Sequence, residues 1–252
     1  MPEVALAVEL RSRTHVDPEP RAVSSEPSDP GDESGPVTPK GRRTRTKLIA
    51  AASEVFAERQ YLDTNVADIV ARAGVSHGTF YTYFRSKEEI FKEVAVGLQE
   101  VMLATREQAP REAGLSLFDR VERTNRAYLQ AYQDHAALFA VVEQVASFNP
   151  EFRSIRREIR NGFVERSERS IARMQRDGIV HDDVDPRYAA NALGSMVDRF
   201  AYVYLVLGED FDFDESVRTL TLLWARALGI EAPHGVLGMP KRRAARRRQR
   251  PT

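Results

Sequence analysis

The chain of 252 residues contains no cysteine. Disulfides and thiol catalysis are therefore excluded, and the composition suits a cytoplasmic protein. No apolar run reaches the roughly 18 residues that a membrane span needs, and the N-terminus lacks the basic start and apolar segment of a secretory signal. The formal net charge is zero, with 37 basic and 37 acidic side chains. That balance, taken alone, argues against a nucleic-acid partner.

The neutral total conceals a separation of charge along the chain. Residues 1–39 hold 3 basic and 8 acidic side chains, residues 40–92 hold 10 and 6, residues 93–238 hold 17 and 23, and residues 239–252 hold 7 and none. The first segment also holds 7 of the 13 prolines. Both ends are too polar to bury a core, so they are predicted to be a disordered acidic tail and a disordered basic tail. Partners meet local charge rather than the average.

Between these tails, apolar residues recur at helical spacing and no strand pattern of useful length appears. This periodicity predicts an all-α fold of nine helices. The Asp185-Pro186 pair is a helix start, with Asp as N-cap and Pro at the first helical position. The expected helices cover about residues 44–59, 66–73, 76–84, 87–108, 115–134, 136–147, 150–177, 186–207 and 213–228.

The stretch GVSHGTFYTYFRSK, residues 74–87, is rich in both hydroxyls and aromatic rings. A short helix that stops at Gly74 and a second that is capped by Ser76 form a helix-turn-helix pattern. At about 100° per residue, Phe80 and Phe84 face the core. The opposite face carries Thr79, Thr82 and Tyr83, with Tyr81 to one side. A helix with such a hydroxyl face fits a DNA major groove, where Thr and Tyr bond to base edges or phosphates.

Residues 44–91, TRTKLIAAASEVFAERQYLDTNVADIVARAGVSHGTFYTYFRSKEEIF, resemble the DNA-binding domain of the TetR family of transcriptional regulators. The alanine-rich first helix ending in FAER, the AGVSxGTFYxYFxSKE core and their separation agree with the family pattern. The resemblance implies that Thr79, Tyr81 and Tyr83 contact DNA from a recognition helix. One departure is Gln60, where the family usually has glycine, so the end of the first helix is expected to be irregular.

The predicted DNA contacts rest partly on the residues and partly on this resemblance. Lys87 begins the fourth helix, where free N–H groups and its ammonium would jointly hold a phosphate. The resemblance implies a second phosphate contact at the cap formed by Thr64 or Asn65. His77 is either a base reader or an ordinary exposed histidine. The full predicted set is Arg43, Arg45, Thr64, Asn65, Ser76, His77, Gly78, Thr79, Tyr81, Thr82, Tyr83 and Lys87.

Two basic segments flank the expected core. Residues 40–47, KGRRTRTK, hold five basic side chains just before the first helix. They are predicted to form an arm along phosphates or in an adjacent minor groove, with a solvated linker as the alternative. The seven basic residues at 241–250 either add non-specific DNA affinity by counterion release or form a solvated tail.

The TetR resemblance also implies that residues 93–238 form a helical domain that dimerises and binds a small effector. Small residues on the 186–207 helix permit close helix approach, and the resemblance implies that it pairs with the last helix and their symmetry mates. Ordinary intrachain core is the alternative. The predicted dimer contacts are Leu193, Met196, Val197, Phe200, Tyr204, Val217, Leu220 and Trp224.

An effector pocket needs apolar walls and a few polar groups. Together the candidates suggest a partly aromatic cavity for an apolar or acyl-type ligand, with plain core or surface as the alternative for each single residue. They are Phe118, Val121, Asn125, Tyr128, Tyr132, Phe139, Val142, Phe163, Asn191 and Arg199.

Other classes of function find less support. HDDVD, residues 181–185, is the best metal-like cluster, but it lies between expected helices and Asp185 already has a capping role. No nucleophile–base pair, phosphate-binding glycine loop or zinc spacing occurs, so no cofactor and no enzymatic activity are predicted. An architectural DNA binder that uses mainly its tails is the second alternative. The sequence predicts a cytoplasmic, nucleoid-associated homodimeric regulator, a repressor more than an activator, that binds a palindromic operator and a small effector.

Overall fold

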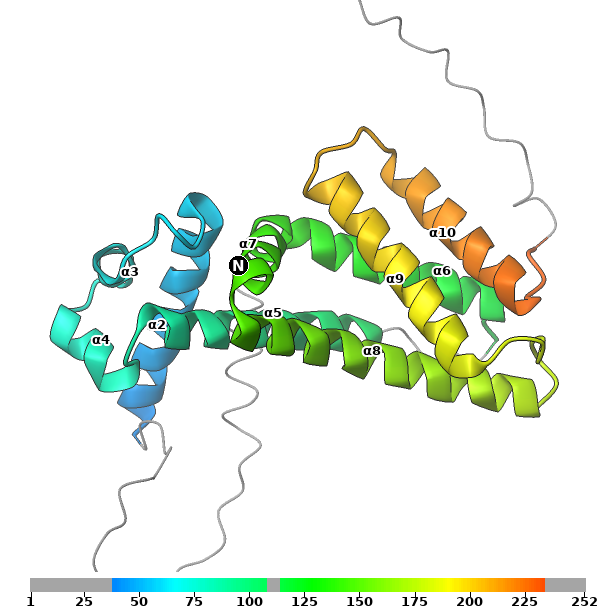
Figure 1. The fold of residues 1–252 in the computed structure, drawn as a ribbon, viewed down its shortest axis with the longest axis horizontal. Helices are drawn as coiled ribbons and strands as arrows, with labels where there is room; N and C mark the ends of the chain where they lie inside the picture. The colour runs from blue at the N-terminus through cyan, green and yellow to red at the C-terminus, as the bar shows by residue number, and fades with distance from the viewer. Residues whose placement is uncertain (1–37, 108–113, 234–252) are drawn as a thin grey trace, which may run out of the picture.

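The computed structural model describes residues 38–107 and 114–233. These two ranges contain helices and no strand, so the all-α prediction is confirmed (Figure 1). The predictions for the two tails, including the basic residues at 241–250, lie outside the described residues. The nine helices of the described ranges are α2 (Pro39–Arg59), α3 (Val66–Ala73), α4 (His77–Tyr83), α5 (Lys87–Glu107), α6 (Leu117–Asp134), α7 (Ala136–Phe148), α8 (Pro150–Arg176), α9 (Pro186–Leu205) and α10 (Phe213–Leu228).

Helix α2 begins at Pro39, earlier than the predicted start at Thr44. The Thr38 hydroxyl caps it by accepting a 3.1 Å hydrogen bond from the Gly41 amide, and Pro39 occupies the first helical position. The predicted arm at residues 40–47 is therefore helical, and the prediction of a separate arm was wrong. Thr38-Pro39 is an ordinary helix start, but it sits at the end of a proline-rich segment and was assigned to the tail.

The next two helices form the helix-turn-helix pattern as expected. Asn65 caps α3 in a capping box with Asp68, and the helix ends at Gly74 in the left-handed conformation, with φ of 61°. Ser76 accepts a hydrogen bond from the Thr79 amide and starts α4. Helices α2, α3 and α4 are called the helix-turn-helix unit below.

The remaining helices extend from one side of this unit. Figure 1 shows α5 and α8 running away from it along the molecule, with α6, α9 and α10 at the far end. Helix α7 lies against both α2 and α8, α9 packs on α8, and α10 packs on α6. One hydrophobic cluster continues from Phe56 in α2 through Leu98 in α5 to Val197 in α9. The helix-turn-helix unit and the C-terminal helices therefore share a continuous core.

No helix of the described ranges has both the length and the apolar character required to cross a membrane.

Candidate DNA-binding surface and effector region

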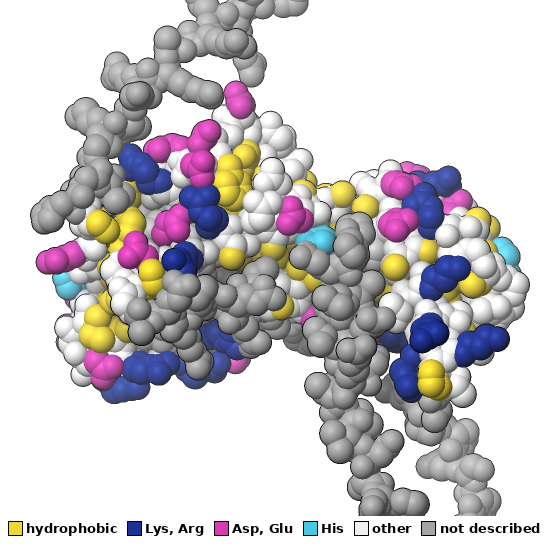
Figure 2. Space-filling model, turned by 180° about the vertical axis from the view of Figure 1, so that it is seen from behind, with side chains coloured by type: hydrophobic (Ala, Val, Ile, Leu, Met, Phe, Trp, Pro, Cys, Tyr) yellow, Lys and Arg dark blue, Asp and Glu magenta, His cyan; other side chains and the backbone are white. Residues whose placement is uncertain are grey.

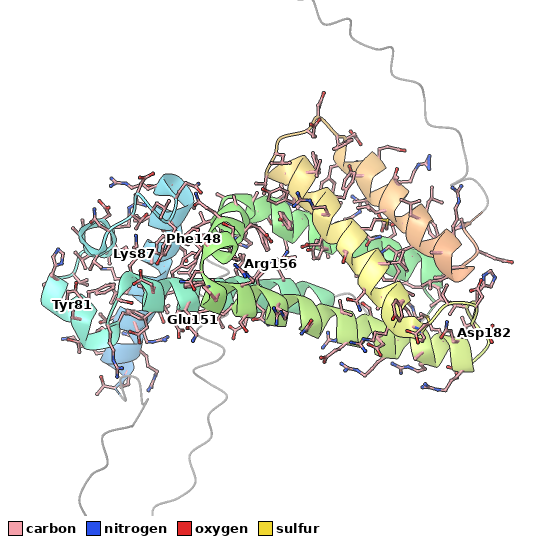
Figure 3. The ribbon with its side chains drawn as sticks, viewed as in Figure 1. Tyr81, Lys87, Phe148, Glu151, Arg156 and Asp182 are labelled. Carbon is pink, nitrogen blue, oxygen red and sulfur yellow. The ribbon has the colours of Figure 1, made fainter. Side chains whose placement is uncertain are left out.

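The recognition helix α4 has a buried phenylalanine face and an exposed polar face. Phe80 and Phe84 are 0% and 2% exposed, which confirms their predicted core role. Tyr81 is 57% exposed and lies at the outer edge of the helix-turn-helix unit in Figure 3. His77, Gly78 and Thr82 are also exposed, whereas Thr79 is half-buried. Tyr83 is half-buried and packs against the core. The exposed part of the predicted set is therefore centred on Tyr81.

Several hydroxyls of this helix already make hydrogen bonds within α4 and its cap. The Ser76 and Thr79 hydroxyl oxygens lie 2.9 Å apart, and the Thr82 hydroxyl donates a 3.1 Å hydrogen bond to the Gly78 carbonyl. A Cβ added at Gly78 would meet only the Ser76 hydroxyl, at 3.9 Å, so the helix surface is open at that point. A backbone or base edge has room to approach closely here, as the sequence predicts.

The two candidate cap residues before α3 have different roles. Asn65 is exposed and its side chain accepts a 3.0 Å hydrogen bond from the Asp68 amide. Thr64 is only 2% exposed, and its hydroxyl donates a 2.7 Å hydrogen bond to the Gln60 carbonyl. The Thr64 side chain is therefore turned inward and stabilises the turn, and a phosphate contact at this residue stays a prediction. The cap is Asn65.

Lys87 is engaged by the protein's own backbone. Its ammonium donates hydrogen bonds to the carbonyls of Tyr61, at 2.8 Å, and Thr64, at 2.7 Å. It also lies 4.4 Å from the centroid of the Tyr61 ring, a cation–π contact. These contacts use two of the three N–H donors of the ammonium. A phosphate contact by Lys87 stays a prediction, and its role in holding the turn was not foreseen.

The basic residues at the start of α2 divide into two groups. Arg45 forms a 2.7 Å ion pair with Glu93 and lies 5.3 Å from the Phe84 ring centroid, so it faces α5 and the core. Other basic side chains of the unit are exposed, and Figure 2 shows Lys and Arg gathered on the lower part of the unit. The exposed basic side chains are Lys40, Arg42, Arg43, Lys47 and Arg85, together with Arg59 and Arg72, which form ion pairs with carboxylates of α3 and α2.

The turn between α2 and α3 contains a strained residue. Gln60 has φ of 65° and ψ of 170°, a combination that is essentially confined to glycine. Among the described residues with positive φ, Gln60 alone is not a glycine. The irregular helix end that the sequence led us to expect is confirmed. Backbone strain of this kind persists only where neighbouring contacts hold it in place.

A polar network links four helices of the C-terminal region. The Tyr128 phenol on α6 donates a 2.8 Å hydrogen bond to Asp198 on α9. Arg156 on α8 donates to the other oxygen of Asp198, at 2.9 Å, and to Glu143 on α7. Burial, reinforced by the Asp198 charge, raises the pKa of Tyr128 well above its ordinary value. Burial also raises the pKa of the neighbouring Tyr132.

The sequence did not lead us to Glu143, Arg156 or Asp198, because the three are far apart in the chain. The one available signal was an arginine four residues after the apolar Phe152 on the same helix, which places both on one face.

The predicted pocket residues occupy several environments. Phe139 and Val142 are buried, and the Phe139 ring stacks on Tyr132 with centroids 4.0 Å apart. Asn125 is buried and donates a 3.2 Å hydrogen bond to the Thr221 hydroxyl. Phe118 is buried in a separate cluster with two residues of α10. These residues are not gathered around one point in the described structure.

The remaining described pocket candidates lie closer to the surface than these core residues. Val121 is half-buried, and the Asn191 amide donates to the Arg187 carbonyl within α9. Arg199 is exposed, with its guanidinium over the Tyr202 ring, and its place in a pocket stays a prediction. The side chain of Phe163 lies outside the described residues.

Half of the predicted dimer residues are buried in the core of a single chain. Leu193, Val197, Val217 and Leu220 are between 0% and 9% exposed. These side chains have little surface left to offer a partner, and their contact with a second copy stays a prediction. Met196, Phe200, Tyr204 and Trp224 are half-buried. Large apolar side chains that do face outward on these helices are Tyr188 on α9, 78% exposed, and Leu223 on α10, 43% exposed.

The HDDVD segment is a structural connection. The His181 amide donates a 3.0 Å hydrogen bond to the Leu228 carbonyl, and its ring lies so close to Gly229 that a Cβ there would collide with it. The Asp185 carboxylate accepts hydrogen bonds from the Arg187 and Tyr188 amides as the N-cap of α9. No group of three or more potential metal ligands is found among the described residues.

Comparison with known proteins agrees with this geometry. The sequence profile described as "Bacterial regulatory proteins, tetR family" matches residues 48–94. The HTH-type transcriptional regulator TcmR of Streptomyces glaucescens is 30% identical over 201 residues, covering 71% of this chain and 84% of TcmR. The fatty acid metabolism regulator protein of Bacillus subtilis (strain 168) is 25% identical over 171 residues, covering 66% of this chain and 86% of that protein.

The fold is shared with solved structures. A TetR-family transcriptional regulator from Syntrophomonas wolfei has a TM-score of 0.62 with 21% identity, covering 74% of this chain and 95% of that one. The match to TcmR is several times longer than the helix-turn-helix unit and therefore extends into the C-terminal helices. The chain belongs to the TetR family and is a helix-turn-helix transcriptional regulator, not an enzyme.

Proposed function

We propose that the protein is a homodimeric repressor that binds a palindromic operator and releases it when a small effector binds. Residues 40–92 act as the DNA-binding domain and residues 93–238 as the effector-binding and dimerisation domain, in the cytoplasm at the nucleoid. The observation that carries the DNA-binding part is the exposed face of α4 around Tyr81, next to the exposed cations at the start of α2. Two-fold symmetry would place two such helices in successive major grooves.

We propose that base contacts come from the exposed positions of α4. His77, Tyr81 and Thr82 offer donors and acceptors to base edges. Thr79 and Tyr83 are half-buried, so they contact DNA only along their outer edges. Ser76 and Gly78 permit close approach of the backbone, and Asn65, Arg43 and Lys87 serve phosphates. Arg45 reaches phosphate only if it leaves Glu93.

The test begins with the full-length wild-type chain, which is used to select an operator from random duplex DNA. Tyr81→Ala should then weaken operator binding by about 1–3 kcal/mol and binding to random DNA by much less. Ile179→Ala, an exposed apolar truncation between α8 and α9, is the control and should bind the operator as wild type does. Equal losses on both DNAs would make Tyr81 a backbone contact, and wild-type affinity in Tyr81→Ala would contradict readout by α4.

We propose an apolar or acyl-type effector. Support comes from the aromatic core of the C-terminal helices, where Tyr128, Tyr132 and Phe139 lie together, and from the similarity to a fatty acid metabolism regulator. Palmitate and palmitoyl-coenzyme A are suitable probes for release of the selected operator. Release by either at micromolar concentration would support the class, and no release by saturated acyl chains of 8 to 18 carbons would rule it out.

A further inference from the structure

The first turn of α8 inserts a side chain into the core of the helix-turn-helix unit. Phe152 is 1% exposed, and its ring centroid lies 4.9 Å from Phe91 and 6.5 Å from Tyr61. The Tyr61 ring stacks on Phe56 at 5.8 Å and contacts Phe91 at 4.9 Å. A residue of the C-terminal helices thus contacts the Tyr61 ring, which lies in the turn between α2 and α3.

The same turn is held from the other side by α5. Lys87 bonds to the Tyr61 and Thr64 carbonyls, and the Tyr61 phenol donates a 2.8 Å hydrogen bond to Glu88. The strained backbone at Gln60 begins this turn, and Asn65, which ends it, caps α3. The turn at residues 60–65 therefore sets where α3 starts, and α4 follows α3 after a tight turn at Gly74.

The other end of the connection lies one helical turn further along α8. Arg156 is four residues after Phe152 and joins α8 to Glu143 on α7 and Asp198 on α9. Figure 3 shows Arg156 on α8 between the helix-turn-helix unit and the crossing with α9. Arg156 therefore ties the segment of α8 that carries Phe152 to both α7 and α9.

We propose that Phe152 is a positioning residue for DNA recognition, which transmits the placement of α8 through Tyr61 to the turn at residues 60–65 and so to α3 and α4. This inference rests on the proposed function, because it gives the effector-binding helices a route to the recognition helix. The rigid part of the route is the buried aromatic contact. The nearby ion pair of Lys92 and Glu151 is about half exposed on both sides and contributes little.

Hydrogen exchange of the full-length protein without DNA tests the route directly. Phe152→Leu keeps an apolar side chain and removes the ring contact with Tyr61. Amides of residues 66–83, which Phe152 does not touch, should exchange about threefold faster or more than in wild type. Phe118→Leu is the matched control, because Phe118 is equally aromatic and buried but packs on α10, and it should leave exchange in residues 66–83 unchanged.

Operator binding supplies the second measurement. Phe152→Leu should weaken operator binding by about threefold to thirtyfold, with the salt dependence of binding unchanged, because no phosphate contact is removed. Exchange changes confined to α5 and α8, together with wild-type operator affinity, would overturn the inference. Failure of the wild-type chain to select any operator would instead count against the proposed function, and the exchange measurement would still decide the role of Phe152.

Discussion

Arg156 on α8 and Asp198 on α9 form a 2.9 Å ion pair in which both side chains are mostly buried, and Glu143 is the second carboxylate on the same guanidinium. Removing the cation leaves two carboxylates without their counter-ion, and among the described residues only the hydrogen bond from Tyr128 to Asp198 remains. Arg156→Gln should therefore lower the free energy of unfolding by about 2–4 kcal/mol at pH 7, as measured by urea denaturation. The double variant Arg156→Gln with Asp198→Asn should recover part of that loss. Strictly additive losses would show that Arg156 and Asp198 do not act together.

Because of Tyr128, the free energy of unfolding should depend on pH in the alkaline range. An unfolded tyrosine releases its proton near pH 10, whereas burial and the Asp198 charge keep Tyr128 protonated in the fold to higher pH. Above about pH 10 the unfolded state binds fewer protons, so the free energy of unfolding should fall by up to about 1.4 kcal/mol per pH unit from this group. Denaturation between pH 9 and 11 should show a shallower fall in Tyr128→Phe. The same slope in both proteins would contradict the linkage.

Gln60 offers a stabilising substitution. Its backbone conformation costs about 1–3 kcal/mol for a residue with a Cβ, while glycine loses about 0.4–1 kcal/mol through the entropy of the unfolded chain. Gln60→Gly should therefore raise the free energy of unfolding by about 1 kcal/mol, measured by thermal or denaturant unfolding. Gly74→Ala, at φ of 61° with only ordinary contacts around the added Cβ, should do the opposite by a similar amount. A neutral or destabilising Gln60→Gly would mean that the turn is not strained.

The dimer interface is best tested at the apolar side chains of α9 and α10 that are exposed in a single subunit. If α9 and α10 pair with a second copy through their outward faces, Tyr188→Asp with Leu223→Asp should give a folded monomer in sedimentation, because both side chains are exposed in one subunit. Leu193→Asp is the contrasting variant and should lose helical signal, since it buries a charge in the intrachain core. A folded dimer of the double variant would place the interface elsewhere.

The sequence predicted the features that depend on local spacing. Helical periodicity and caps located the helices, and the phenylalanine pair of α4 faces the core as expected. Thr64 and Asn65 are adjacent and both favour caps, so pattern alone could not tell which one turns inward. The apolar stripe of α9 was equally ambiguous, because burial in the same subunit and burial against a partner demand the same residues. Phe152 and Arg156 act through contacts with distant segments, which no local pattern records.

The first turns of α2 carry Lys40, Arg42 and Arg43 and no acidic residue. The N-terminal end of a helix is its positive end, so these cations lie where helix electrostatics disfavour them. A phosphate placed there would offset this unfavourable interaction and favour the helical form. A phosphate contact at the start of α2 would then stabilise the helix as well as the complex.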